Sequence, residues 1–293
     1  MGLLEGCEMR WQGQRQSGNV EDRRGTGYGR PVAAGGCGFL LLGLLALFLF
    51  GDPSLLLQQA TAPEMAPIPQ TVPPAEPGMP DTARDFVATV LADTEETWGR
   101  IFAERGSRYV PPTLVLFEQA TRSACGLGSS AMGPFYCSVD QKVYIDLSFY
   151  DDLARRFGAP GDFAQAYVLA HEIGHHVQNL IGVMDQVNRL GARIGDAERN
   201  ALSVRQELQA DCFAGIWGHH AAKYRDMLEP GDVEEGLRAA AAIGDDRIQR
   251  QTQGYVVPES WTHGSSEQRL YWFRRGLESG NIDSCDTFQQ LEP

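Results

Sequence analysis

The residues of this sequence best suited to chemistry lie in the segment AYVLAHEIGHHV, residues 166–177. His171 and His175 are four positions apart, and such residues share one face of a helix, so both imidazoles can hold one metal ion. Glu172 lies between them and can reach a water bound to that ion, whose pKa the metal lowers toward neutrality. The pattern predicts hydrolysis of a peptide bond with Glu172 as the general base.

An HExxH match alone is weak evidence, because its three fixed residues recur by chance. The alternative is a helix that carries two surface or core histidines. The flanking Val168, Leu169 and Ile173 indicate a buried helix, and buried histidines need partners, which a metal ion supplies. Gly174 costs helix stability, and we expect it to leave room beside the ion.

A third ligand is expected downstream of this motif. The metzincin pattern HExxHxxGxxH is excluded, because Gln178 and Ile181 stand at the last two fixed positions. The segment RQELQADCFAG, residues 205–215, offers Glu207 on a second predicted helix. Glu207 would complete a site of two histidines and one glutamate, with the fourth position left for water.

Asp211 lies four residues after Glu207 and can accept the other N–H of a ligand histidine, which would fix its tautomer. The alternative is a solvated acidic face of the helix. The neighbouring Cys212, Phe213 and Trp217 are apolar, which disfavours that alternative. We therefore expect Asp211 to support the metal ligands from behind.

HExxH followed by ExxAD resembles the glutamate-ligand zincins, and more specifically the neutral zinc metallopeptidase family of bacterial membrane proteins. The resemblance covers nearly the whole chain through the segments MRWQGQRQSGNVEDRRG from Met9, GPFYCSVDQKVYIDLSF from Gly133, AHEIGHHVQ, RQELQADCFAG and WTHGSSEQR. It implies a zincin-like fold in which VYIDLSF, residues 143–149, borders the cleft. It also implies a start near Met9, with residues 1–8 as an upstream extension.

The segment WTHGSSEQR places His263 in a loop before a helix that Ser265 or Ser266 could cap. As in related zincins, His263 could donate to the oxyanion of the tetrahedral intermediate. Arg269 resembles the arginine of an HPxxxxR arrangement, where it would orient the substrate or the loop. The alternative is a loop histidine with a structural arginine, and the sequence leaves both open.

Other polar residues are weaker candidates for the site. Tyr144 and Tyr255 could take the same role as His263. His176 points about 100° away from His175 on a helix, so we interpret it as structural. His219 and His220 lie late in the second predicted helix and are interpreted as solvated rather than ligating.

The elements that must position these residues form an α+β domain, helix-rich with a small sheet. Apolar periodicity predicts a helix over Asp81–Glu104, and alternating β-branched and aromatic content predicts strands over Thr113–Gln119 and Lys142–Phe149. Further helices are predicted over 161–181, 197–224, 232–249 and 265–279. No internal repeat is visible.

Four of the six cysteines fall in this domain, and none is part of a CxxC pair, which disfavours a cysteine-rich zinc ribbon. By proximity Cys125 would pair with Cys137, which leaves Cys212 with Cys285. Four cysteines allow three connectivities, and buried free thiols are the alternative in a reducing compartment.

The N-terminal part predicts a membrane anchor. Residues 1–31 are polar, arginine-bearing and expected to be a flexible cytoplasmic tail, and residues 32–50 carry no charge and are long enough to span a bilayer. The basic region is too long for a cleaved signal peptide, which favours an uncleaved anchor. Residues 51–80 are a Pro/Ala-rich linker, and the arginine asymmetry predicts export of the domain at 81–293 to the periplasmic side.

Composition bounds the function further. The chain of 293 residues has 43% hydrophobic and 22% charged residues, as globular proteins do, and its net charge of −13 argues against nucleic acid as a partner. The predicted function is a zinc peptidase with one Zn²⁺ and a protein or peptide substrate. The alternatives are a non-catalytic scaffold with a zincin fold and a metal-dependent hydrolase of cell-wall amides. The sequence does not indicate an oligomeric state.

Overall fold

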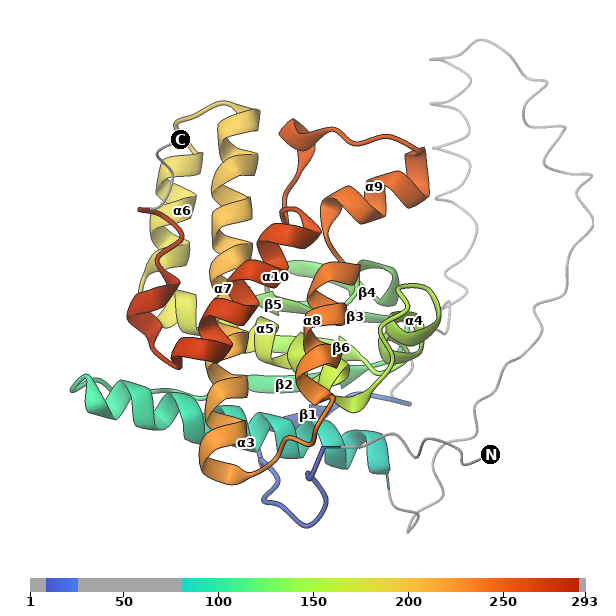
Figure 1. The fold of residues 1–293 in the computed structure, drawn as a ribbon, viewed down its shortest axis with the longest axis vertical. Coiled ribbons are helices and arrows are strands. Elements are labelled where there is room, and N and C mark those ends of the chain that lie inside the picture. Colours follow the sequence, from blue (N-terminus) through green and yellow to red (C-terminus); the bar gives the residue numbers. More distant parts are fainter. Residues whose placement is uncertain (1–8, 26–80, 290–293) are drawn as a thin grey trace, which may run out of the picture. The chain divides into compact units, whose positions relative to one another are not determined.

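The computed structural model describes residues 9–25 and 81–289, which belong to one compact unit. A four-stranded sheet lies behind the helices in Figure 1, in the order β1-β2-β6-β5. Strands β1 (Val20–Asp22), β2 (Thr113–Phe117) and β6 (Lys142–Asp146) are parallel, and β5 (Phe135–Cys137) pairs antiparallel with β6. The two central strands are largely buried, which fits their β-branched and aromatic content.

A second, two-stranded sheet joins β2 to β5. It consists of β3 (Ala120–Ser123) and β4 (Gly126–Ser129), followed by the 3-10 helix η2 (Ser130–Met132). The predicted disulfide between Cys125 and Cys137 is present, with an S–S distance of 2.06 Å. It links the turn of this hairpin to the end of β5.

Helices make up most of the described chain, so the predicted helix-rich α+β class is confirmed. They are α3 (Thr82–Glu104), α4 (Phe149–Arg155), α5 (Asp162–Leu180), α6 (Val183–Gly191), α7 (Asp196–Arg225), α8 (Asp232–Ala242), α9 (Asp245–Gln253) and α10 (Ser266–Ser279), with 3-10 turns η3 (Pro258–Ser260) and η4 (Ile282–Cys285).

The helix predicted over 232–249 is instead two helices, because α8 ends at Ala242 and Gly244 caps the start of α9. Helix α6 was not predicted. Its mean hydropathy is low and only Gly191 in it is buried. Ser265, by contrast, caps α10 as expected, and its side chain accepts from the backbone N–H of Gln268.

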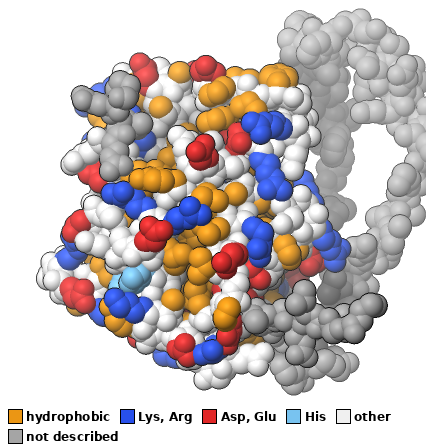
Figure 2. Space-filling model, in the orientation of Figure 1, with side chains coloured by type: hydrophobic (Ala, Val, Ile, Leu, Met, Phe, Trp, Pro, Cys, Tyr) orange, Lys and Arg blue, Asp and Glu red, His pale blue; other side chains and the backbone are white. Residues whose placement is uncertain are grey.

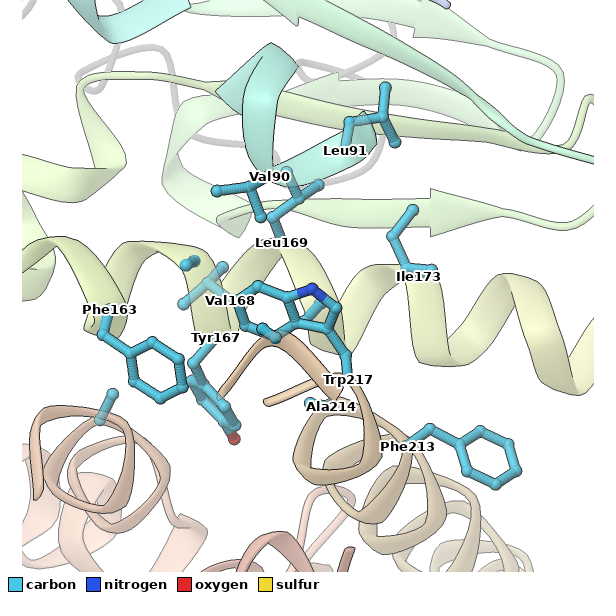
Figure 3. Close-up of a cluster of buried hydrophobic side chains, with 14 of the residues drawn as sticks. Val90, Leu91, Phe163, Tyr167, Val168, Leu169, Ile173, Phe213, Ala214 and Trp217 are labelled. Carbon is cyan, nitrogen blue, oxygen red and sulfur yellow. The ribbon is translucent and has the colours of Figure 1, made fainter. Parts of the chain in front are cut away.

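Helix α5 is the centre of the hydrophobic core. Figure 3 shows Leu169 and Ile173 pointing from α5 toward Val90 and Leu91 of α3, while Phe163 and Tyr167 point to the opposite side. Helix α7 covers that opposite side with Phe213, Ala214 and Trp217. A helix that is apolar on two sides must be buried, which is why the ligand motif lies deep in the domain.

Glycines set the close approach of the helices that carry the site. A Cβ at Gly174 would lie 2.8 Å from the carbonyl oxygen of Ala210, so this glycine makes room for the backbone of α7 rather than for an ion. A Cβ at Gly276 would lie 1.9 Å from the Cys212 carbonyl oxygen, which shows how closely α10 packs on α7 (Figure 1). The predicted Cys212–Cys285 disulfide is also present and ties η4 to α7.

The expectation that residues 1–31 form a flexible tail is wrong for residues 9–25. Strand β1 pairs with β2 from Val20↔Leu114 to Asp22↔Leu116, and Arg24 forms an ion pair with Asp81. The docking combines backbone pairing, ion pairs and isolated apolar contacts of Met9 and Trp11. Because these apolar residues follow no period, hydrophobic patterning could not reveal it.

The predicted anchor at 32–50 and the linker at 51–80 lie outside the described residues. Within 9–25 and 81–289, no helix is both long and apolar enough to cross a bilayer. On the face shown in Figure 2, acidic and basic side chains are interspersed.

Candidate metal centre

The two motif histidines and Glu207 converge, as the sequence predicted. His171 and His175 come from α5 and Glu207 from α7, and one ligand atom of each lies within 4.8 Å of the others. Nε2 of His171 is 3.1 Å from Oε2 of Glu207, and Nε2 of His175 is 3.4 Å from Oε1. All three side chains are largely buried.

These distances fit a zinc site. Ligand atoms at about 2.0–2.1 Å around a tetrahedral ion lie roughly 3.3 Å from one another, close to the two separations in the structure. Nitrogen and carboxylate oxygen are also the donor types that Zn²⁺ takes in catalytic sites with three protein ligands. The residues present therefore fit the ion that the sequence pattern predicts.

Asp211 holds His171 from behind, as predicted. Oδ1 of Asp211 accepts a hydrogen bond from Nδ1 of His171 at 2.8 Å, which leaves the lone pair of Nε2 for a metal ion. Arg269 of α10 grips the same carboxylate with two N–H donors, at 2.8 and 2.9 Å, and the Tyr167 hydroxyl donates to it as well. Arg269 is only 2% exposed and its guanidinium is engaged by Asp211, so it supports Asp211 at the edge of the cleft.

His175 has a different support, which the sequence analysis missed. Its Nδ1 lies 3.0 Å from Oε1 of Gln178, three residues further along α5. The Nε2 group of Gln178 donates to Gln206 and Gln209, so its oxygen must face the histidine. The i+3 spacing was a usable signal, whereas the contribution of Tyr167 depended on how α5 packs against α7.

The charges of the centre balance one another. Burial lowers the pKa of His171, but Asp211 and Glu207 outweigh it and raise that pKa to about 10. Burial likewise opposes ionisation of Glu207, yet His175 and His171 hold its pKa well below the usual value. For Asp211, Arg269 and His171 overcome burial and lower the pKa to about 2. The carboxylates are therefore stabilised as anions facing positive charge.

Glu172 lines the same cleft as the ligands and is 8% exposed. Among the described residues no hydrogen bond engages its carboxylate, so both oxygens are available to a water or a substrate. The cleft has a volume of about 390 Å³ and apolar walls that include Met132, Phe149 and Ile243.

His263 also lines this cleft, as predicted, and is half exposed. Its Nδ1 lies 3.3 Å from Oδ1 of Asp245, whose other oxygen accepts the backbone N–H groups of residues 262, 263 and 264. The hydrogen bond that His263 donates to Asp245 is the main cause of the raised pKa of His263. Asp245 was not predicted, because it lies 18 residues upstream at the start of α9.

The strand that borders the cleft is β5 rather than β6, and of the segment 143–149 only Phe149, at the start of α4, lines the cleft. Strand β6 lies between β2 and β5, and the cleft is lined by Phe135 and Tyr136 of β5. The expectation overlooked β5 because it has only three residues. Among the described strands, none pairs with its outer edge.

The remaining candidates lie outside the centre. The Tyr144 hydroxyl donates to Asp140, and Tyr255 is 62% exposed and does not line the cleft. His176 is structural, as interpreted, with Nε2 at 2.7 Å from the Val110 carbonyl. His219 and His220 do not ligate, but both contact carbonyl oxygens at the end of α10, so the interpretation of them as solvated is wrong.

Comparison with known proteins finds similarity over nearly the whole chain. A family profile described as "Putative neutral zinc metallopeptidase" matches residues 9–288. The uncharacterized protein YpfJ of Escherichia coli strain K12 is 49% identical over 290 residues, which cover 96% of this chain and 99% of that protein. The uncharacterized protein Rv2575 of Mycobacterium tuberculosis strain H37Rv is 44% identical over 194 residues, which cover 63% of this chain and 64% of that protein. No solved structure matches the chain.

Proposed function

Because this chain belongs to the neutral zinc metallopeptidase family, we propose that it is a zinc-dependent peptidase that hydrolyses peptide bonds. His171, His175 and Glu207 would hold the ion. The observation that carries the proposal is the convergence of these ligands in a cleft that also presents the unengaged carboxylate of Glu172. When bound, zinc would supply a Lewis acid that polarises a carbonyl group and acidifies water.

Glu172 is the proposed general base. Its carboxylate takes a proton from the attacking water at one oxygen and passes it to the nitrogen of the leaving amine. The position directly after His171 places this carboxylate at the same cleft as the ligands. Its lack of a hydrogen-bond partner among the described residues keeps it free for that transfer.

His263 is proposed to stabilise the oxyanion that develops on the carbonyl oxygen. Asp245 accepts from Nδ1 and so orients the ring, while Nε2 remains to donate toward the cleft. Asp245 raises the pKa of His263, which keeps the ring in its donating, protonated form to higher pH.

The free edge of β5 favours a peptide over a cell-wall amide as the substrate. An extended peptide can pair with an exposed strand edge, and main-chain hydrogen bonds then hold it across the cleft. Phe135 and Tyr136 bring this edge to the same cleft as Glu172. The apolar walls would accept hydrophobic side chains beside the scissile bond.

The two disulfides support an extracytoplasmic location for the domain, since such bonds persist in oxidising compartments. Because β1 lies in the sheet, residues 9–25 would share that side, and a run at 32–50 that enters the bilayer would have both flanks there. In spheroplasts of a Cys7→Ser, Cys37→Ser chain, an impermeant maleimide should label both Gln16→Cys and Glu104→Cys. Labelling of Glu104→Cys alone would instead support a single span at 32–50 with the N-terminal residues in the cytoplasm.

The function is tested with the purified full chain in detergent, against denatured protein, a peptide library and peptidoglycan. Wild type should cleave protein or peptides, and Glu172→Gln should lose cleavage while it keeps its zinc and its melting temperature. Release of peptidoglycan fragments alone would favour the cell-wall amidase. Full cleavage by Glu172→Gln would exclude the assigned base.

A further inference from the structure

Another cavity lies on a different side of α7 from the metal centre. It is formed by α7, the segment after η3 and α10, which contribute Arg205, Trp261 and Trp272 respectively, and we call it the α7–α10 pocket. Its volume of about 490 Å³ lies within the range of roughly 300–1,000 Å³ that ligand sites occupy. Around the axis of α7, Arg205 points about 160° away from Glu207, so the pocket is separate from the metal centre.

The walls of the α7–α10 pocket are mainly aliphatic and aromatic. Val204 and Leu208 line it on α7, and Trp261, Tyr271 and Trp272 line it on the other elements. Trp272 is buried, whereas Tyr271 is half exposed, so the pocket leads from the surface toward the core. Such walls accept an apolar side chain.

The same pocket holds a guanidinium without a partner. The Nε atom of Arg205 is buried, and no hydrogen-bond acceptor among the described residues lies within reach of it. Within the described chain, no ion pair or hydrogen bond engages the rest of this guanidinium. Glu259 also lines the pocket, but it is exposed and does not pair with Arg205. Because an unpaired buried donor is costly, the pocket favours an anionic ligand.

Two side-chain amides at the pocket each have one hydrogen-bonding group left. The Nδ2 group of Asn200 donates to the Glu259 carbonyl oxygen, which leaves Oδ1 as an acceptor. Oε1 of Gln268 accepts the backbone N–H of Ser265, which leaves Nε2 as a donor. A peptide main chain offers the complementary N–H and C=O groups, whereas a fatty acid offers neither beyond its carboxylate.

Shared lining residues connect the α7–α10 pocket to the metal cleft. Asn200 lines both this pocket and a further cavity of about 510 Å³ between α6 and α7. Gln206 lines both that further cavity and the metal cleft. Along α7, Asn200 and Gln206 lie roughly 9 Å apart, a distance that about three residues of an extended chain span. A peptide held in the pocket can therefore reach the metal centre.

We propose that the α7–α10 pocket binds the C-terminal carboxylate of a peptide whose last side chain is apolar. Arg205 donates to the carboxylate, because a planar guanidinium matches two carboxylate oxygens. The tryptophans pack on the last side chain, and the amides of Asn200 and Gln268 bond to the main chain. This binding is independent of the metal chemistry. Cleavage of the bound peptide, at least about three residues before its C-terminus, rests on the proposed function.

The first test measures binding without cleavage. The full chain carrying Glu172→Gln, purified in detergent, is titrated against a fluorescein-labelled octapeptide that ends in leucine with a free carboxylate. The same peptide with a C-terminal amide is the second probe, and fluorescence anisotropy reports the affinity of each. The free acid should bind about 10–100-fold more tightly than the amide, because only the acid pairs with the guanidinium. Equal affinities would overturn the proposal.

Variants then locate the bound carboxylate. In the same background, Arg205→Met should weaken binding of the acid to the level of the amide and leave the amide unchanged. Arg193→Met, at an exposed position outside the pocket, is the matched control and should change neither affinity. Undiminished binding of the acid to Arg205→Met would place the carboxylate elsewhere, such as on a zinc ion, and would contradict the assignment.

A second variant blocks the pocket and leaves its arginine in place. Ala201 is exposed on α7 and lines the pocket, so the phenylalanine of Ala201→Phe can occupy the cavity without disturbing the core. Binding of the free acid should be lost in this variant. Retention of full affinity would show that the peptide binds outside the pocket.

A competitor distinguishes a peptide from a fatty acid. Octanoate has the carboxylate and an apolar chain but no peptide groups, so it should displace the labelled peptide at least about tenfold more weakly than unlabelled peptide does. Competition by octanoate at equal concentration would assign the pocket to a fatty acid and overturn the proposal.

Cleavage by the otherwise unaltered chain separates this proposal from the proposed function. Arg205→Met should raise KM for the free-acid peptide about tenfold and leave kcat unchanged, because Arg205 lies away from the reacting atoms. Binding through Arg205 without any cleavage would support the pocket and count against the peptidase. Cleavage of acid and amide with the same KM would support the peptidase and count against the pocket.

Discussion

Two groups of acidic side chains in this molecule lie in opposite electrostatic surroundings. At the metal centre, Glu207 and Asp211 face His171, His175 and Arg269, and their pKa values are lowered despite burial. At an acidic cluster formed by Asp162, Asp232 and Glu235, burial and mutual repulsion raise the pKa values of Asp232 and Glu235 instead. The domain thus surrounds the carboxylates at one end of α5 with cations, whereas at the other end burial and neighbouring acids dominate the carboxyl pKa values.

The largest expected effect comes from removing a cation at the balanced site. Arg269→Met would leave Asp211 buried without its two N–H donors, a condition like that of Asp232. We expect a loss of about 3–5 kcal/mol in the free energy of unfolding, measured by denaturant titration. Arg199→Met, which removes an exposed pair with Asp196, should cost less than about 1 kcal/mol. Equal losses in both variants would contradict the balance described here.

A smaller effect is expected from replacing Gln178, the uncharged side chain that contacts His175. Gln178→Ala removes the acceptor for Nδ1, so zinc affinity should fall about 10–100-fold. The buried side chain also donates to Gln206 and Gln209, so the free energy of unfolding should fall too, but by less than in Arg269→Met, because no charge is left unpaired. Competition with a chromophoric chelator measures this affinity, and the exposed Gln186→Ala serves as the control. Unchanged affinity would show that Gln178 does not orient the ligand.

At the acidic cluster, Glu235→Gln should raise stability at neutral pH. The substitution removes a carboxyl with a raised pKa, so the melting temperature at pH 7.5 should rise by roughly 2–4 °C. The gain should shrink at pH 5, where the wild-type carboxyl is already protonated. Melting temperatures measured at both pH values check this, with the exposed Glu234→Gln as the control. An equal gain at both pH values would contradict the effect of the charge.

The smallest effect concerns an acid–cation pair at the cleft surface. Asp245→Asn should lower the pKa of His263, because the side-chain hydrogen bond that raises it loses its charge. The protonated form is lost as the pH rises through that pKa, so the alkaline limb of kcat/KM should move to lower pH. The pH profile of peptide cleavage measures this shift, and an unmoved limb would mean that His263 does not act as the donor.

The residues of the metal centre could be predicted from the sequence because the spacings that identify them lie within single helices. The i and i+4 spacings of His171 with His175, and of Glu207 with Asp211, place each pair on one helix face. The disulfide pairs and the capped start of α10 were likewise within reach of short-range reasoning. Residues that support the site only because separate helices meet could not be predicted in this way. Asp245, which orients His263 from the start of α9, is an example.

The N-terminal region was misjudged for a physical reason. Strand β1 has three residues and only Val20 is apolar, so it has no period to detect, and its partner β2 lies more than 90 residues away. The acids of the cluster likewise begin two helices, where acidic residues are ordinary. Their mutual proximity follows from the packing of α8 on α5, which no local pattern reports.

The central claim, that one ion binds between α5 and α7, is tested most directly by counting zinc in purified protein. Elemental analysis should find one zinc per chain in wild type and in Glu172→Gln, and almost none in folded Glu207→Ala. Zinc retained at full stoichiometry in Glu207→Ala, or absent from wild type after purification with zinc present, would contradict the account.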